Sequence, residues 1–127
     1  MIRIEEMEEM LEEIAAGLPE DLFRELNGGI ILLPESKLHK NSIGNDLFTL
    51  GEYRREVGLG KYIAIYFGSF IRVYGHLPAG QLKEKLESTV KHEFRHHLEY
   101  MAGEYDLEIE DALQIEEYKK RKNKKKL

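Results

Sequence analysis

The sequence of 127 residues has no cysteine, no tryptophan and only three prolines. Without cysteine, disulfide bonds and thiolate metal sites are excluded, so any metal must be held by histidines or carboxylates. The same absence leaves the redox compartment open and slightly favours the cytoplasm. The longest apolar stretch, YIAIYFGSFI at residues 62–71, is far shorter than the roughly 20 residues that cross a bilayer. The acidic start, MIRIEEMEEM, argues against a signal peptide.

Charge is distributed unevenly along the chain. The formal net charge is −5, but the last ten residues, YKKRKNKKKL, contain seven Lys or Arg and no acid. The other residues therefore carry −12, which is −5 less the +7 of this segment, and such an acidic body disfavours nonspecific nucleic-acid binding. We expect a single domain over residues 1–118 and a solvated basic tail at 119–127. Contacts of this tail with RNA, anionic lipid or an acidic partner are the alternatives.

Hydrophobic periodicity predicts an α+β fold, with a small mixed sheet of three to four strands packed against helices. Apolar residues recur at helical spacing over residues 4–16, and Pro19 opens a short second helix, PEDLFREL. Strands are expected at GIILLP, FTLGEYRREV and KYIAIYF, with a hairpin turn at Gly58 and Gly60. Ser69 is expected to cap a short helix, and residues 106–122 are expected to form the last helix.

The longest helical pattern follows Pro78 and runs to Gly103, where a left-handed glycine is expected to end it. Within this helix, His92 and His96 lie one turn apart on one face, with Cβ atoms about 5–6 Å apart. Both imidazoles can reach one zinc ion at about 2.0–2.1 Å. Glu93 is rotated by about 100° from His92, so it lies beside the metal, where a carboxylate can take a proton from metal-bound water.

These residues form an HExxH motif, filled here by HEFRH. The alternative is a solvated helix face that carries histidines by chance. His97, directly after the motif, either orients a ligand or packs against the sheet.

Three longer segments resemble the minimal zincin family, the small bacterial zincin-like metallopeptidases. LPEDLFRELNGGIILLPE resembles its opening turn and first strand, LGEYRREVGLGKYIAIYFGSFIR its second and third strands, and LKEKLESTVKHEFRHHLE its motif helix. The resemblance covers roughly residues 4–106. It implies a zinc-dependent peptidase acting on peptides or proteins, with His92 and His96 as zinc ligands, Glu93 as general base and an acidic third ligand downstream.

The family pattern places this third ligand in a glycine-x-x-aspartate stretch, which residues 103–106 (GEYD) supply. The glycine lies farther from His96 than in the family, so the chain departs from the pattern here. Asp106 is the first choice, and the alternatives are Glu104, Glu110, Asp111 and Glu116. Tyr100 or Tyr105 either donates a hydrogen bond to an oxyanion or only packs.

Two further readings of the whole chain stay open. It is a zinc-binding interaction domain without turnover, or a structural protein without metal. KYIAIYF either lies at the sheet edge, where it pairs with an extended substrate, or is a buried strand covered by helices. The sequence leaves the substrate and the oligomeric state open.

Overall fold

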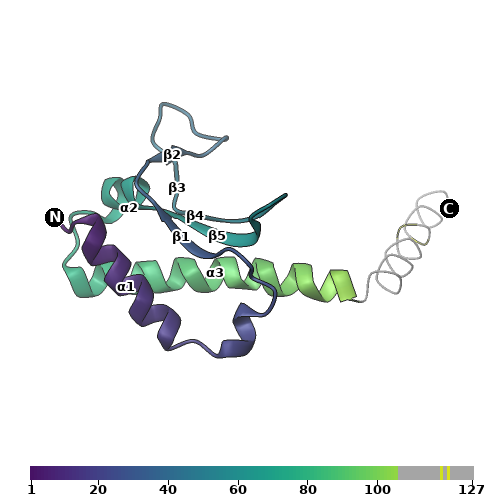
Figure 1. Cartoon of the computed structure of the whole chain (residues 1–127). Helices are drawn as coiled ribbons and strands as arrows, with labels where there is room; N and C mark the ends of the chain where they lie inside the picture. The colour runs from purple at the N-terminus through teal and green to yellow at the C-terminus, as the bar shows by residue number, and fades with distance from the viewer. Residues whose placement is uncertain (106–117, 119, 121–127) are drawn as a thin grey trace. The chain divides into compact units, whose positions relative to one another are not determined.

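The computed structural model describes residues 1–105, 118 and 120 (Figure 1). The chain forms two compact units, Met1–His96 and His97–Leu127. The elements, in chain order, are α1 (Ile4–Ala16), the 3-10 helix η1 (Glu20–Phe23), β1 (Gly29–Leu33), β2 (Lys37–Leu38), β3 (Phe48–Thr49), β4 (Gly51–Glu56), β5 (Gly60–Tyr66), α2 (Phe67–Tyr74) and α3 (Ala79–Tyr105). None of the described helices is long and apolar enough to cross a membrane.

The main sheet has three strands in the order β1-β5-β4. β1 runs parallel to β5, and β4 runs antiparallel to it, which confirms an α+β fold with a small mixed sheet. The short strands β2 and β3 form a separate antiparallel pair. β5 is the central strand, so the reading of KYIAIYF as an edge strand is wrong. The edges belong instead to β1 and β4.

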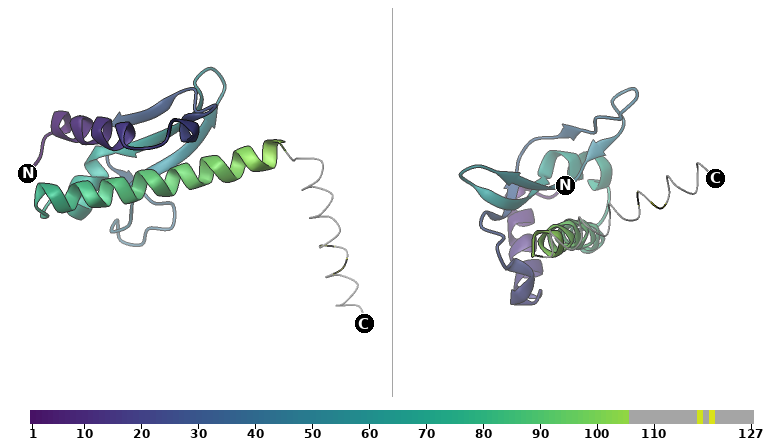
Figure 2. Two further views of the ribbon diagram at one scale, coloured as in Figure 1. Left: turned by 90° about the horizontal axis from the view of Figure 1, so that it is seen from below. Right: turned by 90° about the vertical axis from the view of Figure 1, so that its right-hand side faces the viewer.

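The two faces of β5 contribute to different clusters. Ile63 and Ile65 join the main core, whereas Tyr62, Ala64 and Tyr66 form a second cluster on the other face. In the first unit, α1 and α3 lie on the same face of the sheet (Figures 1 and 2). They bury the side chains that recur at helical spacing in both helices, namely Met7, Leu11, Ile14, Leu82, Leu86, Val90 and Phe94.

Most predicted elements form where expected, but several details differ. The expected helix after Pro19 is only the 3-10 turn η1, and FTLGEYRREV divides into β3 and β4. Ser69 does not cap a helix: it is buried within α2, and its Oγ accepts a hydrogen bond from the Lys37 backbone N–H at 2.9 Å. Gly58 and Gly60 have φ of 94° and 79°, so both adopt the left-handed conformation that the predicted hairpin turn requires.

The motif helix continues past its expected end. α3 includes Gly103 and ends at Tyr105, so the prediction that Gly103 terminates the helix is wrong. A glycine inside a helix costs only about 1 kcal/mol relative to alanine, which favourable neighbouring turns offset. The expected helix at 106–122 lies outside the described residues, except for Tyr118 and Lys120, which are helical.

Candidate functional site

His92 and His96 lie on successive turns of α3 and converge on one point. Their Nε2 atoms are 3.2 Å apart, and their rings meet edge to face with centroids 4.8 Å apart. Both side chains are exposed, so an ion from solvent can reach them. The helical spacing predicted from the sequence therefore brings the two donors together.

The separation of these two nitrogens can be compared with what a metal requires. Two nitrogens bound to a tetrahedral zinc at about 2.0–2.1 Å lie about 3.3–3.4 Å apart. The observed 3.2 Å is close to this value, so the donor pair fits zinc. The same spacing also allows one imidazole N–H to donate a hydrogen bond to the other ring.

Glu93 lies beside this pair but in a different environment. Its side chain is buried, with 7% of the residue exposed. Burial raises the pKa of its carboxyl above the ordinary value, although the nearby His92 and His96 and the backbone N–H of Tyr53 act in the opposite direction. A carboxylate with a raised pKa is a better proton acceptor, which suits a general base.

An open cleft of about 370 Å³ adjoins His92 and Glu93. Ser88 and Thr89 of α3 form one wall with them, and residues 48–51, from β3 to the start of β4, form the other, together with His39. Gly51 permits the two walls to approach: a Cβ at this position would lie 3.1 Å from Thr89 Cγ2.

His39 is a cleft residue that the sequence analysis missed, because no local pattern marks it. Its Nδ1 accepts a hydrogen bond from the Asn41 backbone N–H at 3.0 Å, and its own backbone N–H donates to the Leu47 carbonyl at 2.8 Å. These two bonds hold His39 in the β2–β3 connection.

An ion pair attaches β2 to the main sheet near this wall. Lys37 Nζ binds the Glu52 carboxylate, which also accepts a hydrogen bond from the Tyr66 hydroxyl at 2.8 Å. Burial acts to raise the pKa of Glu52, but the hydrogen bonds from Lys37 and Tyr66 outweigh it, and the pKa is lowered. These bonds fix β2, and with it the residues that follow β2, relative to β4.

The remaining predicted site residues are only partly described. His97 is buried, with 1% of the residue exposed, while Tyr100 is half-buried. Asp106, Glu110, Asp111 and Glu116 lie outside the described residues, and so do the side chains of Glu104 and Tyr105. Within the described part of the chain, no three His, Asp or Glu residues cluster closely enough to hold a metal ion.

Comparisons with known proteins give a structural relative. No protein-family model matches the chain, and no curated protein matches it. It is similar to a solved structure described as a conserved hypothetical protein from Thermo thermophilus, with 33% sequence identity and a TM-score of 0.69. The match covers 80% of this chain and 99% of that chain. The chain therefore belongs to the same family as this conserved hypothetical protein.

Proposed function

We propose that the protein is a zinc-dependent metallopeptidase of the zincin type. The observation that carries the proposal is the convergence of His92 and His96, whose Nε2 atoms have a separation close to the one that zinc requires. The buried Glu93 beside them, the adjoining cleft and the small mixed sheet backed by a long motif helix all support it. The resemblance of three sequence segments to minimal zincins also supports it.

In this proposal His92 and His96 hold the zinc, and Asp106 is the first choice for the third ligand. A zinc ion bound there supplies a Lewis acid that polarises a peptide carbonyl and lowers the pKa of water. Glu93 accepts a proton from the attacking water as its oxygen bonds to the carbonyl carbon. It then delivers that proton to the amide nitrogen as the C–N bond breaks.

In this proposal, the edge of β4 beside the cleft orients the substrate. Among the described residues, β4 has a strand partner on one side only, β5. The Tyr53 backbone N–H bonds to Glu93, so the other edge of β4 lies beside the cleft. An extended peptide can add to this edge by backbone hydrogen bonds, with its scissile carbonyl near Glu93.

The decisive experiment separates metal binding from hydrolysis. Wild-type protein purified in the presence of zinc is measured for bound metal and then screened against a peptide library. His92→Ala and His96→Ala should each weaken zinc binding at least about 100-fold, because even changes next to metal ligands cost about 10–100-fold. His76→Ala, which changes an exposed histidine outside the motif, serves as the control.

Glu93→Gln should keep the zinc and lose hydrolysis by at least about 100-fold, since general-base catalysis contributes about 10²–10⁴-fold. Glu84→Gln makes the same chemical change at an exposed position of α3 and should leave hydrolysis unchanged. Hydrolysis that survives Glu93→Gln would eliminate the proposed base.

The second candidate function is a zinc-binding interaction domain without turnover. The small size of the cleft favours this function, because a small cleft offers little wall to hold a peptide substrate. Its volume of about 370 Å³ is near the lower end of the range for ligand sites, about 300–1,000 Å³. For such a domain, partner binding would be lost in His92→Ala and kept in Glu93→Gln.

A further inference from the structure

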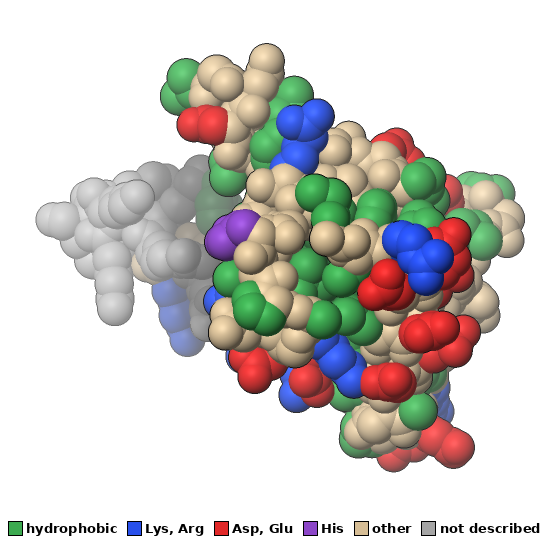
Figure 3. Space-filling model, turned by 90° about the vertical axis from the view of Figure 1, so that its left-hand side faces the viewer, with side chains coloured by type: hydrophobic (Ala, Val, Ile, Leu, Met, Phe, Trp, Pro, Cys, Tyr) green, Lys and Arg blue, Asp and Glu red, His purple; other side chains and the backbone are tan. Residues whose placement is uncertain are grey.

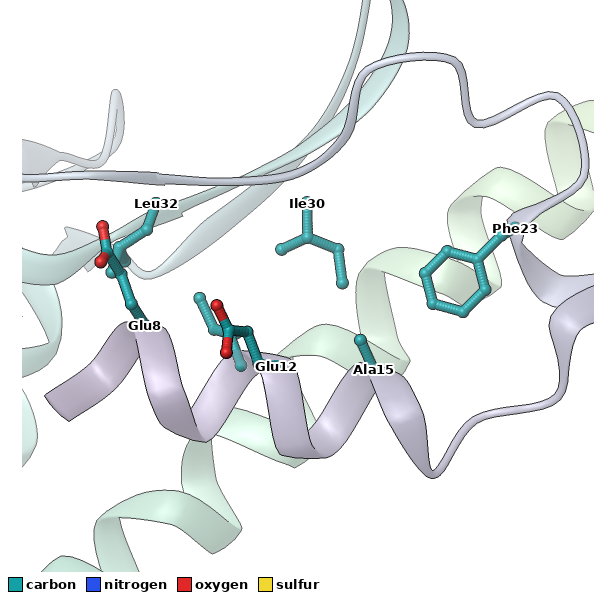
Figure 4. A pocket seen from close by; sticks show the side chains of 7 residues that line it. Glu8, Glu12, Ala15, Phe23, Ile30 and Leu32 are labelled. Atoms are coloured by element: carbon teal, nitrogen blue, oxygen red, sulfur yellow. The ribbon is translucent and has the colours of Figure 1, made fainter. Parts of the chain in front are cut away.

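A second hollow lies at the opposite edge of the sheet, between α1 and β1 (Figure 4). This α1–β1 groove has a volume of about 460 Å³ and is lined by Glu8, Leu11, Glu12 and Ala15 of α1, by Ile30 and Leu32 of β1, and by Phe23. We propose that the groove docks an extended segment of a partner protein whose strand face toward α1 carries both apolar residues and Lys or Arg. This inference goes beyond the proposed function and does not depend on it.

The strand that borders the groove can accept another strand. Within the described residues, β1 pairs only with β5, so its outer edge has backbone N–H and C=O groups without a sheet partner. Ile30 and Leu32 are two residues apart and point to the same face, and both line the groove. A segment that pairs with this edge therefore places every second side chain in the apolar groove.

The opposite wall supplies negative charge. Glu8 and Glu12 are four residues apart on α1, so they lie on one face of the helix, and Figure 4 shows their carboxylates on the side that faces β1. Both are exposed, and neither forms an ion pair with another described residue. Figure 3 shows acidic side chains along the right and lower border of another view of the surface, with Lys and Arg among them.

This combination selects the chemistry of the occupant. The apolar lining requires apolar side chains, and the carboxylates favour Lys or Arg beside them. Nucleic acid does not fit, because the carboxylates of Glu8 and Glu12 would repel its phosphates. The chain's own basic end, YKKRKNKKKL, has the charge, but its apolar side chains are limited to its first and last residues.

The α1–β1 groove and the cleft that adjoins His92 and Glu93 lie at different edges of the sheet. The cleft adjoins β4, the groove adjoins β1, and β5 lies between these two strands. A docked segment would therefore leave the proposed substrate path open.

The test is the binding of a fluorescein-labelled peptide to the full chain, followed by fluorescence anisotropy. The peptide carries Val and Lys in turn at every second position, with Ser between them, so that both lie on one face of the strand. We expect saturable binding that weakens with salt, since exposed charges are screened. The double variant Glu8→Gln/Glu12→Gln should weaken binding about threefold to tenfold, because each exposed ion pair contributes about 0.2–1 kcal/mol. Glu5→Gln/Glu9→Gln removes the same charge from α1 outside the groove lining and should change binding much less.

Two further probes separate the strand and the groove from general charge attraction. A peptide with the same sequence but N-methylated backbone amides should bind at least about tenfold more weakly, because it cannot complete a strand. Ala15→Trp should block the groove while keeping both glutamates. The exposed Glu8→Gln/Glu12→Gln variant keeps the test decisive if Ala15→Trp fails to fold.

Four results would overturn the proposal. The two double variants could bind equally weakly, or an all-Lys peptide could bind as tightly as the alternating one, which would indicate charge attraction alone. Deletion of residues 119–127 could strengthen peptide binding, which would assign the groove to the chain's own tail. A dimer that dissociates in Glu8→Gln/Glu12→Gln would assign it to a second copy. His92→Ala and Glu93→Gln should bind the peptide normally, so failure of the proposed function would not be confused with failure of this inference.

Discussion

The rings of Phe23 and Phe94 pack edge to face, with centroids 5.0 Å apart and ring planes at 75°. Phe94 lies between Glu93 and the second histidine of the motif, and only 2% of the residue is exposed. Phe23 belongs to η1, far away in the sequence. The contact therefore fixes the N-terminal part of the chain against the motif helix.

A double-mutant cycle should measure this contact. Phe23→Leu, Phe94→Leu and the double variant are compared by urea unfolding. Because edge-to-face aromatic pairs contribute about 0.5–1.5 kcal/mol beyond their buried area, we expect a coupling free energy of that size. Strictly additive effects of the two changes would show that the rings do not interact.

The third zinc ligand can be identified by conservative substitution downstream of the motif. Asp106→Asn should lower zinc affinity by at least about tenfold, because it replaces a charged donor with a neutral one. Glu104→Gln, Glu110→Gln, Asp111→Asn and Glu116→Gln, tested in the same competition with a chromophoric chelator, should each change affinity less than Asp106→Asn. A larger loss in one of these four would reassign the ligand to that position.

The Lys37–Glu52 ion pair predicts a pH dependence of stability. The pKa of Glu52 is lowered from its ordinary value of 4.5, so its stabilising effect is fully present above pH 4.5 and is lost as the pH falls through the lower folded pKa. The pKa of Lys37 is raised from 10.5, so its effect is fully present below pH 10.5 and is lost as the pH rises through the folded pKa.

Glu52→Gln should therefore lower the free energy of unfolding at pH 7 by roughly 1 kcal/mol or less, because solvent screens this half-exposed pair. The difference from wild type should shrink in urea unfolding at pH 3. Glu87→Gln, which removes the more exposed pair with Lys91, should have a smaller effect at pH 7. A difference that is the same at both pH values would contradict the assigned pairing.

Gly68 should not tolerate a side chain. A Cβ there would lie 2.6 Å from the Ser36 backbone nitrogen and 2.8 Å from the Glu35 carbonyl carbon, and backbone atoms cannot move aside easily. Gly68→Ala should lower the free energy of unfolding by about 1–3 kcal/mol. Gly80→Ala is the matched control in the first turn of α3, where a Cβ meets nothing within 4 Å. It should be neutral or stabilise by up to about 1 kcal/mol.

Local patterns were enough to predict the helices and the histidine pair. The apolar spacing of Met7, Leu11 and Ile14 predicts α1 with its observed end at Ala16, and the four-residue spacing places His92 beside His96. Both predictions depend only on the geometry of one helix. The prediction at Gly103 failed because turn propensity is weak compared with the rest of a long helix.

The sheet order and the cleft depend on contacts between distant segments. The parallel pairing of β1 with β5 makes KYIAIYF central, and nothing in that segment alone distinguishes a central strand from an edge strand. Ser69 resembles a helix cap in sequence, but its hydroxyl binds the distant Lys37 backbone. His39 reaches the cleft only through the hydrogen bonds of its loop, so no spacing rule could have indicated it.

The motif lies on the same continuous helix as the buried stripe of Leu82, Leu86 and Val90. Random mutagenesis of this gene, selected only for activity, would therefore recover inactive clones at these positions as well as at the donors. Hits along the stripe would reflect loss of folded protein, and soluble yield measured for each clone would separate them from true site mutations. For a chain this small, a map of tolerated substitutions would identify the buried core residues as well as the residues of the proposed site.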